Sequence, residues 1–424
     1  MRKRVLLKGP VLSQSGYGVH ARTVYRALKS REDLFDIYVE PINWGKTSWL
    51  WEDNLERREI DMLVAKTHAY KMHGGQFDIA LLVTIPNEWE MYRAAPVNIG
   101  ITAGIETSKV APEWLDFTNK FVDKVIVPSE FSKRIFIQTQ HAAKDQAGNE
   151  HVLKLNKPIE VINYPIKKYE EKDLGIELDC DFNFLAVAQW SKRKNIENTV
   201  RWFIEEFIDQ EVGLVLKVNH SNNSTLDRLY VEQSLKLVLR DEQYKDKKCK
   251  VHLLHGYMNN DEIHSLYQHP KIKALLSLTH GEGFGLPLFE AAYCGLPVIS
   301  HDWGGQTDFL TAEVKKAGKV KRKNFYAKVE YDFQPVQRES VWPGVITEDS
   351  YWAFPKQGSA KMKMREVYKQ YSRYKSQAKK LQKTLQKTHN AEKINEQFVK
   401  AIYGEEEDSE AWLDQIDQIV QEYE

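Results

Sequence analysis

Residues 279–307 read THGEGFGLPLFEAAYCGLPVISHDWGGQT, and they follow an apolar run, IKALLSL (272–278), that predicts a buried strand. The strand ends at a glycine-rich turn, and Pro287 stands at the start of a helix, where proline is tolerated best. Cys294 and Gly295 end this helix, and residues 296–300 begin another strand. The stretch therefore predicts a strand–loop–helix–strand unit with its loop at the edge of an open α/β sheet, where ligands bind.

Two glutamates flank this turn. Glu282 precedes the helix, and we expect Glu290 in its first turn, so both can face one crevice. The glycines and the free N–H groups of the helix favour a phosphate, which two carboxylates would repel. The carboxylates instead suit hydroxyl groups on either side of a diphosphate, as in a nucleotide sugar. The alternative is a solvated Glu282 with a Glu290 that only favours the helix dipole. The spacing beside a glycine loop favours the ligand interpretation.

The string EGFGLPLFEAA (282–292) resembles the two-glutamate signature of retaining glycosyltransferase family four, the glycosyl transferases group 1. CGLPVI (294–299) and the pair Gly304–Gly305 are similar to that family as well, and the resemblance extends from about residue 4 to about residue 310. It implies an α/β protein with the GT-B fold. In that fold two Rossmann-like domains face a central cleft, and C-terminal helices cross back to the first domain.

Strands and helices alternate in both halves of the chain, which favours two Rossmann-like domains. We expect an acceptor-side domain over residues 1–166 and a nucleotide-sugar-binding domain over 182–385. Residues 167–181 are charged and lack core periodicity, which is typical of a linker. A C-terminal helical segment is expected over 386–424, and its stretch 386–403 is the candidate for the crossing. The polar segment 141–157 and the lysine-rich segment 313–330 read as loops.

The composition is ordinary for a globular protein. The chain has 424 residues, 42% of them hydrophobic, with 60 Lys and Arg balancing 60 Asp and Glu. This balance gives no clear nucleic-acid signal, although a local basic face is not excluded. Three cysteines are too few for a disulfide framework. Neither a signal peptide nor a run long enough to cross a bilayer is visible, so we expect a cytoplasmic protein, soluble or peripheral.

In the first half, PVLSQSGYG (10–18) forms a second glycine turn that enters a helix but lacks the Gly-Lys-Ser/Thr of a phosphate-binding P-loop. It resembles the first glycine loop of the family, which makes Gly16 and Gly18 donor-binding candidates and places Tyr17 on the acceptor side. Glu106 follows a strand and is a candidate catalytic or acceptor contact, with helix capping as the alternative. Many family members carry a histidine near residues 87–88, where this chain has Asn and Glu.

In the second half, QWSKRKN (189–195) places a basic cluster between a strand and a helix, which favours a diphosphate site over a merely solvated run. The family has an arginine and a lysine at this turn. Lys194 matches the lysine, whereas Gln189 stands where the arginine is expected, and Arg193 is the candidate substitute. Tyr257 ends a segment that resembles the place where the family's backbone holds the base.

The resemblance implies a retaining, metal-independent transferase that uses a nucleoside-diphosphate sugar as substrate and needs no cofactor. Glu282 would orient the sugar, Glu290 would hold the ribose, and Lys194 would neutralise the leaving diphosphate, assisted by the amides of Gly283, Phe284, Gly285 and Leu286. The acceptor stays open between a saccharide, a lipid-linked sugar, a protein and a modified nucleobase. Rival functions are a sugar-nucleotide epimerase or phosphorylase on the same fold, and a non-catalytic nucleotide-sugar-binding protein.

Overall fold

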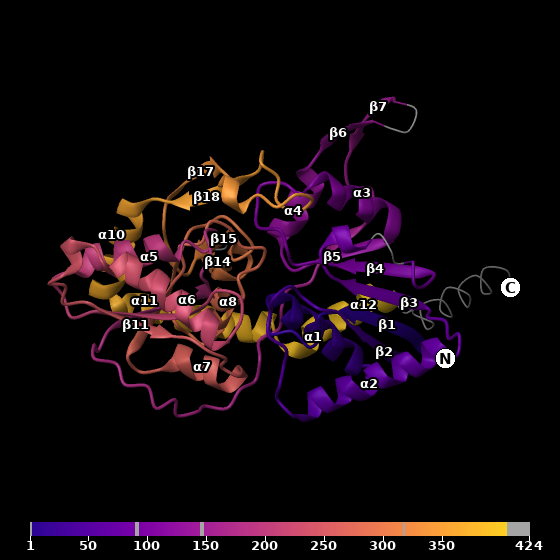
Figure 1. The fold of residues 1–424 in the computed structure, drawn as a ribbon, viewed down its shortest axis with the longest axis horizontal. Coiled ribbons are helices and arrows are strands. Elements are labelled where there is room, and N and C mark those ends of the chain that lie inside the picture. The colour runs from indigo at the N-terminus through magenta and orange to yellow at the C-terminus, as the bar shows by residue number, and fades with distance from the viewer. Residues whose placement is uncertain (1, 90–92, 145–147, 317–318, 405–424) are drawn as a thin grey trace.

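The computed structural model describes residues 2–89, 93–144, 148–316 and 319–404. The expected helix over Glu405–Glu424 lies outside this range. The chain forms two α/β halves that lie side by side, with the first half on the right and the second on the left in Figure 1. Each half contains one six-stranded sheet. This is the two-domain GT-B architecture that the sequence predicts.

The sheet of the N-terminal domain has the order β2-β1-β3-β4-β5-β8 and is parallel throughout. Its strands are short apolar runs that are mostly buried, as expected for a parallel sheet covered on both faces. They are β1 (Lys3–Gly9), β2 (Phe35–Pro41), β3 (Ile79–Val83), β4 (Val97–Ile101), β5 (Lys124–Val127) and β8 (Ile159–Val161). The helices of this half are α1 (Gly16–Lys29), α2 (Leu55–Met72), η1 (Pro86–Glu88), α3 (Pro112–Phe121) and α4 (Glu130–Gln138).

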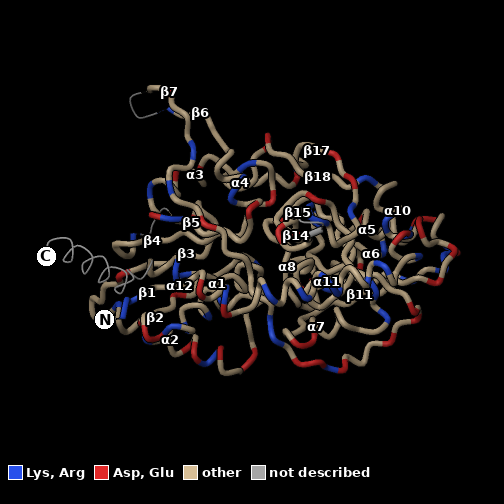
Figure 2. The backbone as a smooth tube through the Cα atoms, turned by 180° about the vertical axis from the view of Figure 1, so that it is seen from behind, with Lys and Arg blue, Asp and Glu red and all other residues tan. Residues whose placement is uncertain are grey.

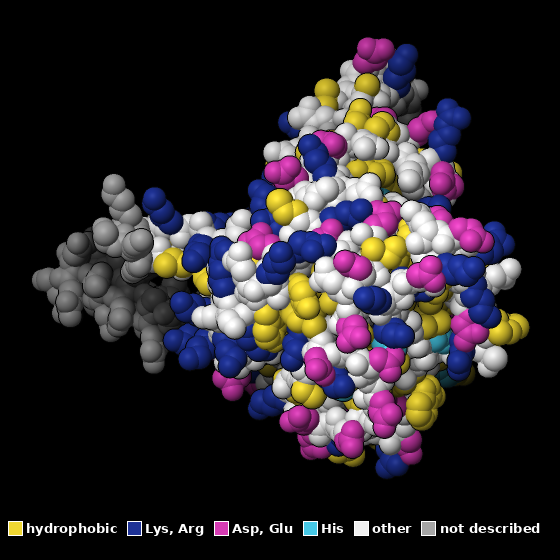
Figure 3. Space-filling model, turned by 90° about the vertical axis from the view of Figure 1, so that its left-hand side faces the viewer, with side chains coloured by type: hydrophobic (Ala, Val, Ile, Leu, Met, Phe, Trp, Pro, Cys, Tyr) yellow, Lys and Arg dark blue, Asp and Glu magenta, His cyan; other side chains and the backbone are white. Residues whose placement is uncertain are grey.

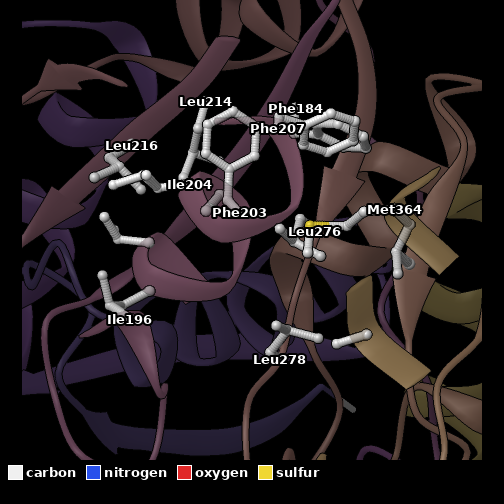
Figure 4. Close-up of a cluster of buried hydrophobic side chains, with 14 of the residues drawn as sticks. Phe184, Ile196, Phe203, Ile204, Phe207, Leu214, Leu216, Leu276, Leu278 and Met364 are labelled. Atoms are coloured by element: carbon white, nitrogen blue, oxygen red, sulfur yellow. The ribbon is translucent and has the colours of Figure 1, made fainter. Parts of the chain in front are cut away.

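The second sheet repeats the pattern in the order β11-β10-β9-β12-β13-β16, again with parallel pairs. Its strands are β9 (Asn183–Gln189), β10 (Gly213–Asn219), β11 (Lys250–Leu254), β12 (Ile272–Leu276), β13 (Val298–Ser300) and β16 (Ala327–Lys328). The elements between them are α5 (Ile196–Phe207), α6 (Thr225–Leu239), η2 (Glu242–Tyr244), α7 (Asn260–Gln268), α8 (Leu286–Tyr293) and α9 (Thr307–Leu310). Figure 4 shows the core beneath α5, where Phe203 and Phe207 meet Phe184 and Leu214 of the sheet.

Two segments that we expected to be loops form hairpins instead. β6 (His141–Lys144) pairs with β7 (Glu150–Leu153), and this hairpin projects from the N-terminal domain (Figure 1). β14 (Thr311–Lys316) pairs with β15 (Lys319–Asn324). β14 and β15 are rich in lysine, and β6 and β7 are only four residues long, so neither pair shows the extended alternation that marks a half-buried strand. A third hairpin joins β17 (Tyr331–Pro335) to β18 (Tyr351–Pro355), with η3 (Arg338–Ser340) between them.

The C-terminal helices return the chain to its first domain. α10 (Gln357–Lys369) and α11 (Tyr371–Thr388) pack on the second domain, with α10 on α5 and α11 on α8. α12 (Ala391–Tyr403) then packs on α1, and its buried Ile394, Phe398 and Ile402 share one core with Val5 and Leu7 of β1. The crossing expected near residues 386–403 is therefore present, in yellow in Figure 1.

Charged side chains of both signs are interspersed over the two domains, in agreement with the balanced composition (Figure 2). The end face of the second domain likewise mixes basic and acidic groups with scattered hydrophobic ones (Figure 3). Within the described ranges, no helix is both long and apolar enough to span a bilayer.

Candidate active site

A cavity of about 1080 Å³ lies between the two domains. Its walls come from residues that follow β4 in the first sheet and β9, β10, β11 and β12 in the second, so it occupies the carboxyl edges of both sheets. It takes in most of the predicted site, namely Gly16, Tyr17, Glu106, Gln189, Arg193, Lys194, Tyr257, Glu282, Phe284, Gly285, Leu286 and Glu290. Gly18 and Gly283 are absent from its lining.

Glu282 is buried in the loop after β12, and Lys194 lies against it. The Lys194 Nζ–Glu282 Oε1 distance is 2.5 Å, and Arg193 Nη1 lies 3.6 Å from Glu282 Oε2. Backbone contacts fasten the two loops together, because the His280 N–H donates to the Arg193 carbonyl at 2.7 Å. Asn195, in the left-handed conformation at φ 55°, supports this junction by donating from Nδ2 to the Leu278 carbonyl.

Glu106 comes from the other domain and completes the cluster. Its Oε1 lies 2.8 Å from Arg193 Nη2, so Arg193 joins the carboxylates of the two domains. Burial raises the pKa of Glu106 despite Arg193 and Lys194. Burial acts the same way on Glu282, but the pKa of that carboxyl is lowered because Lys194 and Arg193 outweigh burial. Burial and Arg193 together lower the pKa of Lys194. The sequence-predicted catalytic residues are thus brought into one cluster.

Glu290 is the fifth residue of α8, so it lies one position beyond the first turn in which we expected it. The helix begins at Leu286, capped by Gly285 at φ 95°, which leaves Glu290 beyond the first turn. Its Oε1 lies 3.1 Å from Lys167 Nζ, and its Oε2 accepts a hydrogen bond from the Tyr267 hydroxyl at 3.2 Å. The carboxylate remains in the cavity wall on the same helix that follows the Glu282 loop.

The first glycine turn is helical. Ser15 caps α1 by accepting from the Gly18 N–H at 3.0 Å, so Gly16 and Gly18 stand in the first turn of the helix rather than in a loop. A Cβ on Gly18 would lie 2.0 Å from the Ser13 carbonyl oxygen, which means that this glycine serves backbone packing. Tyr17 lines the cavity, and its hydroxyl pairs with Thr102 Oγ1 at 2.8 Å.

Gly283 also faces protein backbone. A Cβ there would lie 2.4 Å from the Ala103 carbonyl oxygen of the other domain, and the Gly283 carbonyl accepts from Ser129 Oγ at 2.6 Å. Phe284 is buried against Tyr164 and Phe309. Gly285 and Leu286 remain at the cavity and begin α8.

The sequence departs from the family pattern at Gln189 and at residues 87–88, and the structure places these two segments differently relative to the cavity. Gln189 is exposed at the end of β9 in the cavity wall, and Arg193 takes a central position between Glu106 and Glu282. Asn87 and Glu88 lie in η1 and do not line the cavity, whereas the preceding Ile85 does. No histidine stands in this lining within the described chain.

Sequence reasoning missed several residues of this cavity. Lys217 interrupts the apolar strand GLVLKVN, which was the one available signal for it. Lys167 was assigned to the linker, although it reaches Glu290. Trp342, Val345 and Ile346 come from the segment between β17 and β18, which carries no recognisable motif.

Tyr257 follows β11, and two strands of the sheet separate β11 from β12, which leads into the Glu282 loop. Its ring meets Trp51 of the N-terminal domain edge-on at 6.0 Å. Burial raises its pKa, as does the neighbouring Glu52. Among the described residues, no group of three or more His, Cys, Asp or Glu side chains is placed to hold a metal ion.

Residues 232–324 match the family described as glycosyl transferases group 1. No curated protein matches the chain. Sucrose-phosphate synthase from Thermosynechococcus elongatus is 13% identical with a TM-score of 0.62, covering 94% of this chain and 98% of that chain. Anabaena Alr3699/HepE in complex with UDP and glucose is 13% identical with a TM-score of 0.55, covering 95% and 100%. A structure described as trehalose-6-phosphate from E. coli bound with UDP-2-fluoro glucose is 10% identical with a TM-score of 0.57, covering 95% and 99%.

At these identities the structural likeness establishes the fold. The family match adds the chemistry, because it spans the segment that holds Tyr257, Glu282 and Glu290 in the second domain. The chain is therefore a glycosyltransferase with the GT-B fold, and residues 232–324 of its second domain match the glycosyl transferases group 1.

Proposed function

We propose that the protein is a retaining, metal-independent glycosyltransferase. It moves a sugar from a nucleoside-diphosphate sugar to a hydroxyl group of a saccharide, lipid-linked sugar, protein or modified nucleobase. The observation that carries this proposal is the buried cluster of Glu282, Lys194, Arg193 and Glu106 in the wall of the interdomain cavity. Two cations and two carboxylates suit a reaction in which negative charge develops on a leaving diphosphate while positive charge develops on a sugar.

Each charged side chain of the cluster has its own role in the proposed transfer. Lys194 has three N–H donors, of which Glu282 takes one, so the others are available to a diphosphate oxygen. Glu282 is ionised, because its pKa is lowered, and its carboxylate can accept hydrogen bonds from sugar hydroxyls and stabilise a cationic anomeric carbon. Glu106 reaches the cluster from the N-terminal domain, where an acceptor hydroxyl would enter.

The bond changes balance without a further reactant. The bond between the anomeric carbon and the diphosphate oxygen breaks, and a bond from that carbon to the acceptor oxygen forms on the same face of the sugar. The acceptor proton passes to the departing diphosphate oxygen, which is the nearest base when both groups share one face. A donor and an acceptor that fill the cavity between the domains would displace water from the reacting atoms, which favours transfer over hydrolysis.

Donor binding is the first test. We expect the melting temperature to rise with one nucleoside diphosphate and its sugar, in a panel of UDP-, GDP-, ADP-, CMP- and dTDP-sugars, because a ligand that binds the native state stabilises it. UDP-glucose is the first donor to try, since two structures of similar fold hold UDP compounds. Slow release of the same nucleotide would support transfer chemistry, and a folded sample that responds to no nucleotide would contradict the proposal.

Replacing Glu290 by alanine is expected to weaken donor binding about 10-fold to 100-fold while the rate at saturating donor stays within about 3-fold, because the lost hydrogen bonds are made in both ground and transition states. Isothermal titration with the nucleoside diphosphate measures the first effect, and initial rates measure the second. Glu197→Gln is the control, since Glu197 is exposed outside the cavity. A Glu290→Ala protein with the affinity of the wild type would exclude Glu290 from the donor site.

A further inference from the structure

Lys217 is a cavity lysine without a carboxylate partner. It lies on β10, and its Nζ donates to the Gly256 carbonyl at 2.5 Å. Within the described chain no acidic side chain comes within ion-pair distance of it, whereas Lys194, Arg193 and Lys167 all meet glutamates. Burial lowers the pKa of Lys217 to about 8. An ammonium in this position has two N–H groups left for a ligand.

The place of Lys217 in the sheet sets it apart from the charged cluster. β9 separates β10 from β12, so Lys217 lies on the far side of Arg193 and Lys194 from the Glu282 loop. Side chains alternate along a strand, so Lys217 shares the face of Val215, which packs in the core beneath α8. Glu282 and the paired cations would take the sugar and the diphosphate, which leaves this end of the cavity for the nucleoside. The inference rests on the proposed function in this respect.

The surroundings of Lys217 suit a flat, weakly polar ring. Val187, Met258 and Ile263 line the cavity at this end and pack on the core beneath α8. Gly256 and Tyr257 follow β11, the strand that pairs with β10. Apolar walls with a few placed polar groups are typical of sites for small organic ligands, whereas a phosphate would be surrounded by donors.

Lys217 and Gly256 together present a donor beside an acceptor. The ammonium can only donate, and the Gly256 carbonyl, with two lone pairs, can accept a second hydrogen bond beside the one from Lys217. A ring carbonyl next to a ring N–H matches this pair, as at O4 and N3–H of uracil or O6 and N1–H of guanine. Cytosine and adenine carry the reverse order, and their exocyclic amino group would face the ammonium.

We propose that Lys217, with the carbonyl of Gly256, selects donors whose base carries a carbonyl beside a ring N–H over donors with an exocyclic amino group in that place. Lys217 is thus a specificity-determining residue for the nucleotide. The unfavourable pairing of donor with donor provides the discrimination, because it leaves buried polar groups without partners.

Two matched pairs of nucleotides test the proposal, UDP against CDP and IDP against ADP. Each pair exchanges a carbonyl for an amino group and keeps the size of the base. In the wild-type protein, isothermal titration should show the carbonyl member of one pair binding about 10-fold tighter or more. In Lys217→Met, which keeps most of the length of the side chain without its charge, the difference should fall below about 3-fold. The carbonyl member loses the hydrogen bond from the ammonium, and the amino member no longer faces a second donor.

Lys192→Met is the matched control, because Lys192 is exposed on the turn after β9, outside the cavity lining, and should keep the wild-type preference. The inference would be wrong if nucleotides bound the wild type without a base preference, or if the preference persisted in Lys217→Met. Neither result would contradict the proposed transferase function. An equal loss of pyrophosphate affinity in Lys217→Met would overturn it too, by assigning Lys217 to the diphosphate. If the wild-type protein bound no nucleotide, that result would instead contradict the proposed function on which the inference rests.

Discussion

Replacing Glu282 by glutamine is expected to lower kcat for sugar transfer about 100-fold to 1000-fold, while the donor KM changes by less than about 3-fold. Glutamine keeps the shape of the side chain and can still accept a hydrogen bond from a sugar hydroxyl. It carries no charge, so it cannot stabilise the positive charge that develops at the anomeric carbon. The loss therefore falls on the transition state rather than on the bound substrate.

The ion pairs around Glu282 also change in this variant. Lys194 would lose its partner at 2.5 Å, and breaking a buried pair costs about 3–5 kcal/mol when the remaining ion stays charged. The pKa of Lys194 is already lowered by burial and Arg193, so the amine can shed its proton and soften this cost. Arg193 keeps Glu106 as its partner at 2.8 Å. We therefore expect a folded protein with a lower melting temperature.

Initial rates with saturating donor and acceptor, together with a melting curve, measure both effects. Glu197→Gln makes the same chemical change on an exposed residue near the start of α5 and should leave kcat unchanged. A folded Glu282→Gln protein with wild-type kcat would show that the charge of Glu282 takes no part in transfer.

The local pattern of the sequence predicted the elements that carry the site. The apolar run before Glu282, the glycines after it and Pro287 determine a strand, a turn and a helix within about 20 residues, where sequence periodicity is informative. The meeting of Glu106 with Arg193 depends on how two separately folded domains dock, and no local pattern encodes it. Lys217 was missed for a similar reason, because one lysine in a buried strand reads as an irregularity until its carbonyl partner from the next strand is known.

The glycines show another limit of the sequence. Gly18 was assigned to the donor through the resemblance of its turn to the family's first glycine loop, and Gly283 through its amide in the glycine turn before α8. Both instead let protein backbone approach closely, from Ser13 and from Ala103 respectively. The absence of a Cβ is the same requirement in the two cases, so the sequence predicts the close approach and leaves the identity of the approaching group open.

Replacing Gly281 by alanine is expected to lower the transfer rate about 100-fold or more by moving the two domains apart, since small misplacements of catalytic groups have effects of this size. A Cβ on Gly281 would lie 2.0 Å from the Glu106 carbonyl oxygen, and Trp303 would be 3.1 Å away. The obstructing atom belongs to the backbone of the other domain, so no rotamer change relieves the clash. The Glu106–Arg193 contact beside it would separate as the domains shift.

Each domain keeps its own sheet and core, so the Gly281→Ala protein should fold and still show the melting transitions of its domains. Small-angle X-ray scattering should detect a larger radius of gyration than in the wild type. Gly358→Ala is the matched control, because a Cβ there meets no atom within 4 Å in α10. A Gly281→Ala protein with wild-type dimensions and rate would mean that the docking of the Glu282 loop on residues 103–106 is not the active arrangement. The cluster of Glu282, Arg193 and Glu106 would then not be the catalytic arrangement, because the same docking of the two domains holds these residues together.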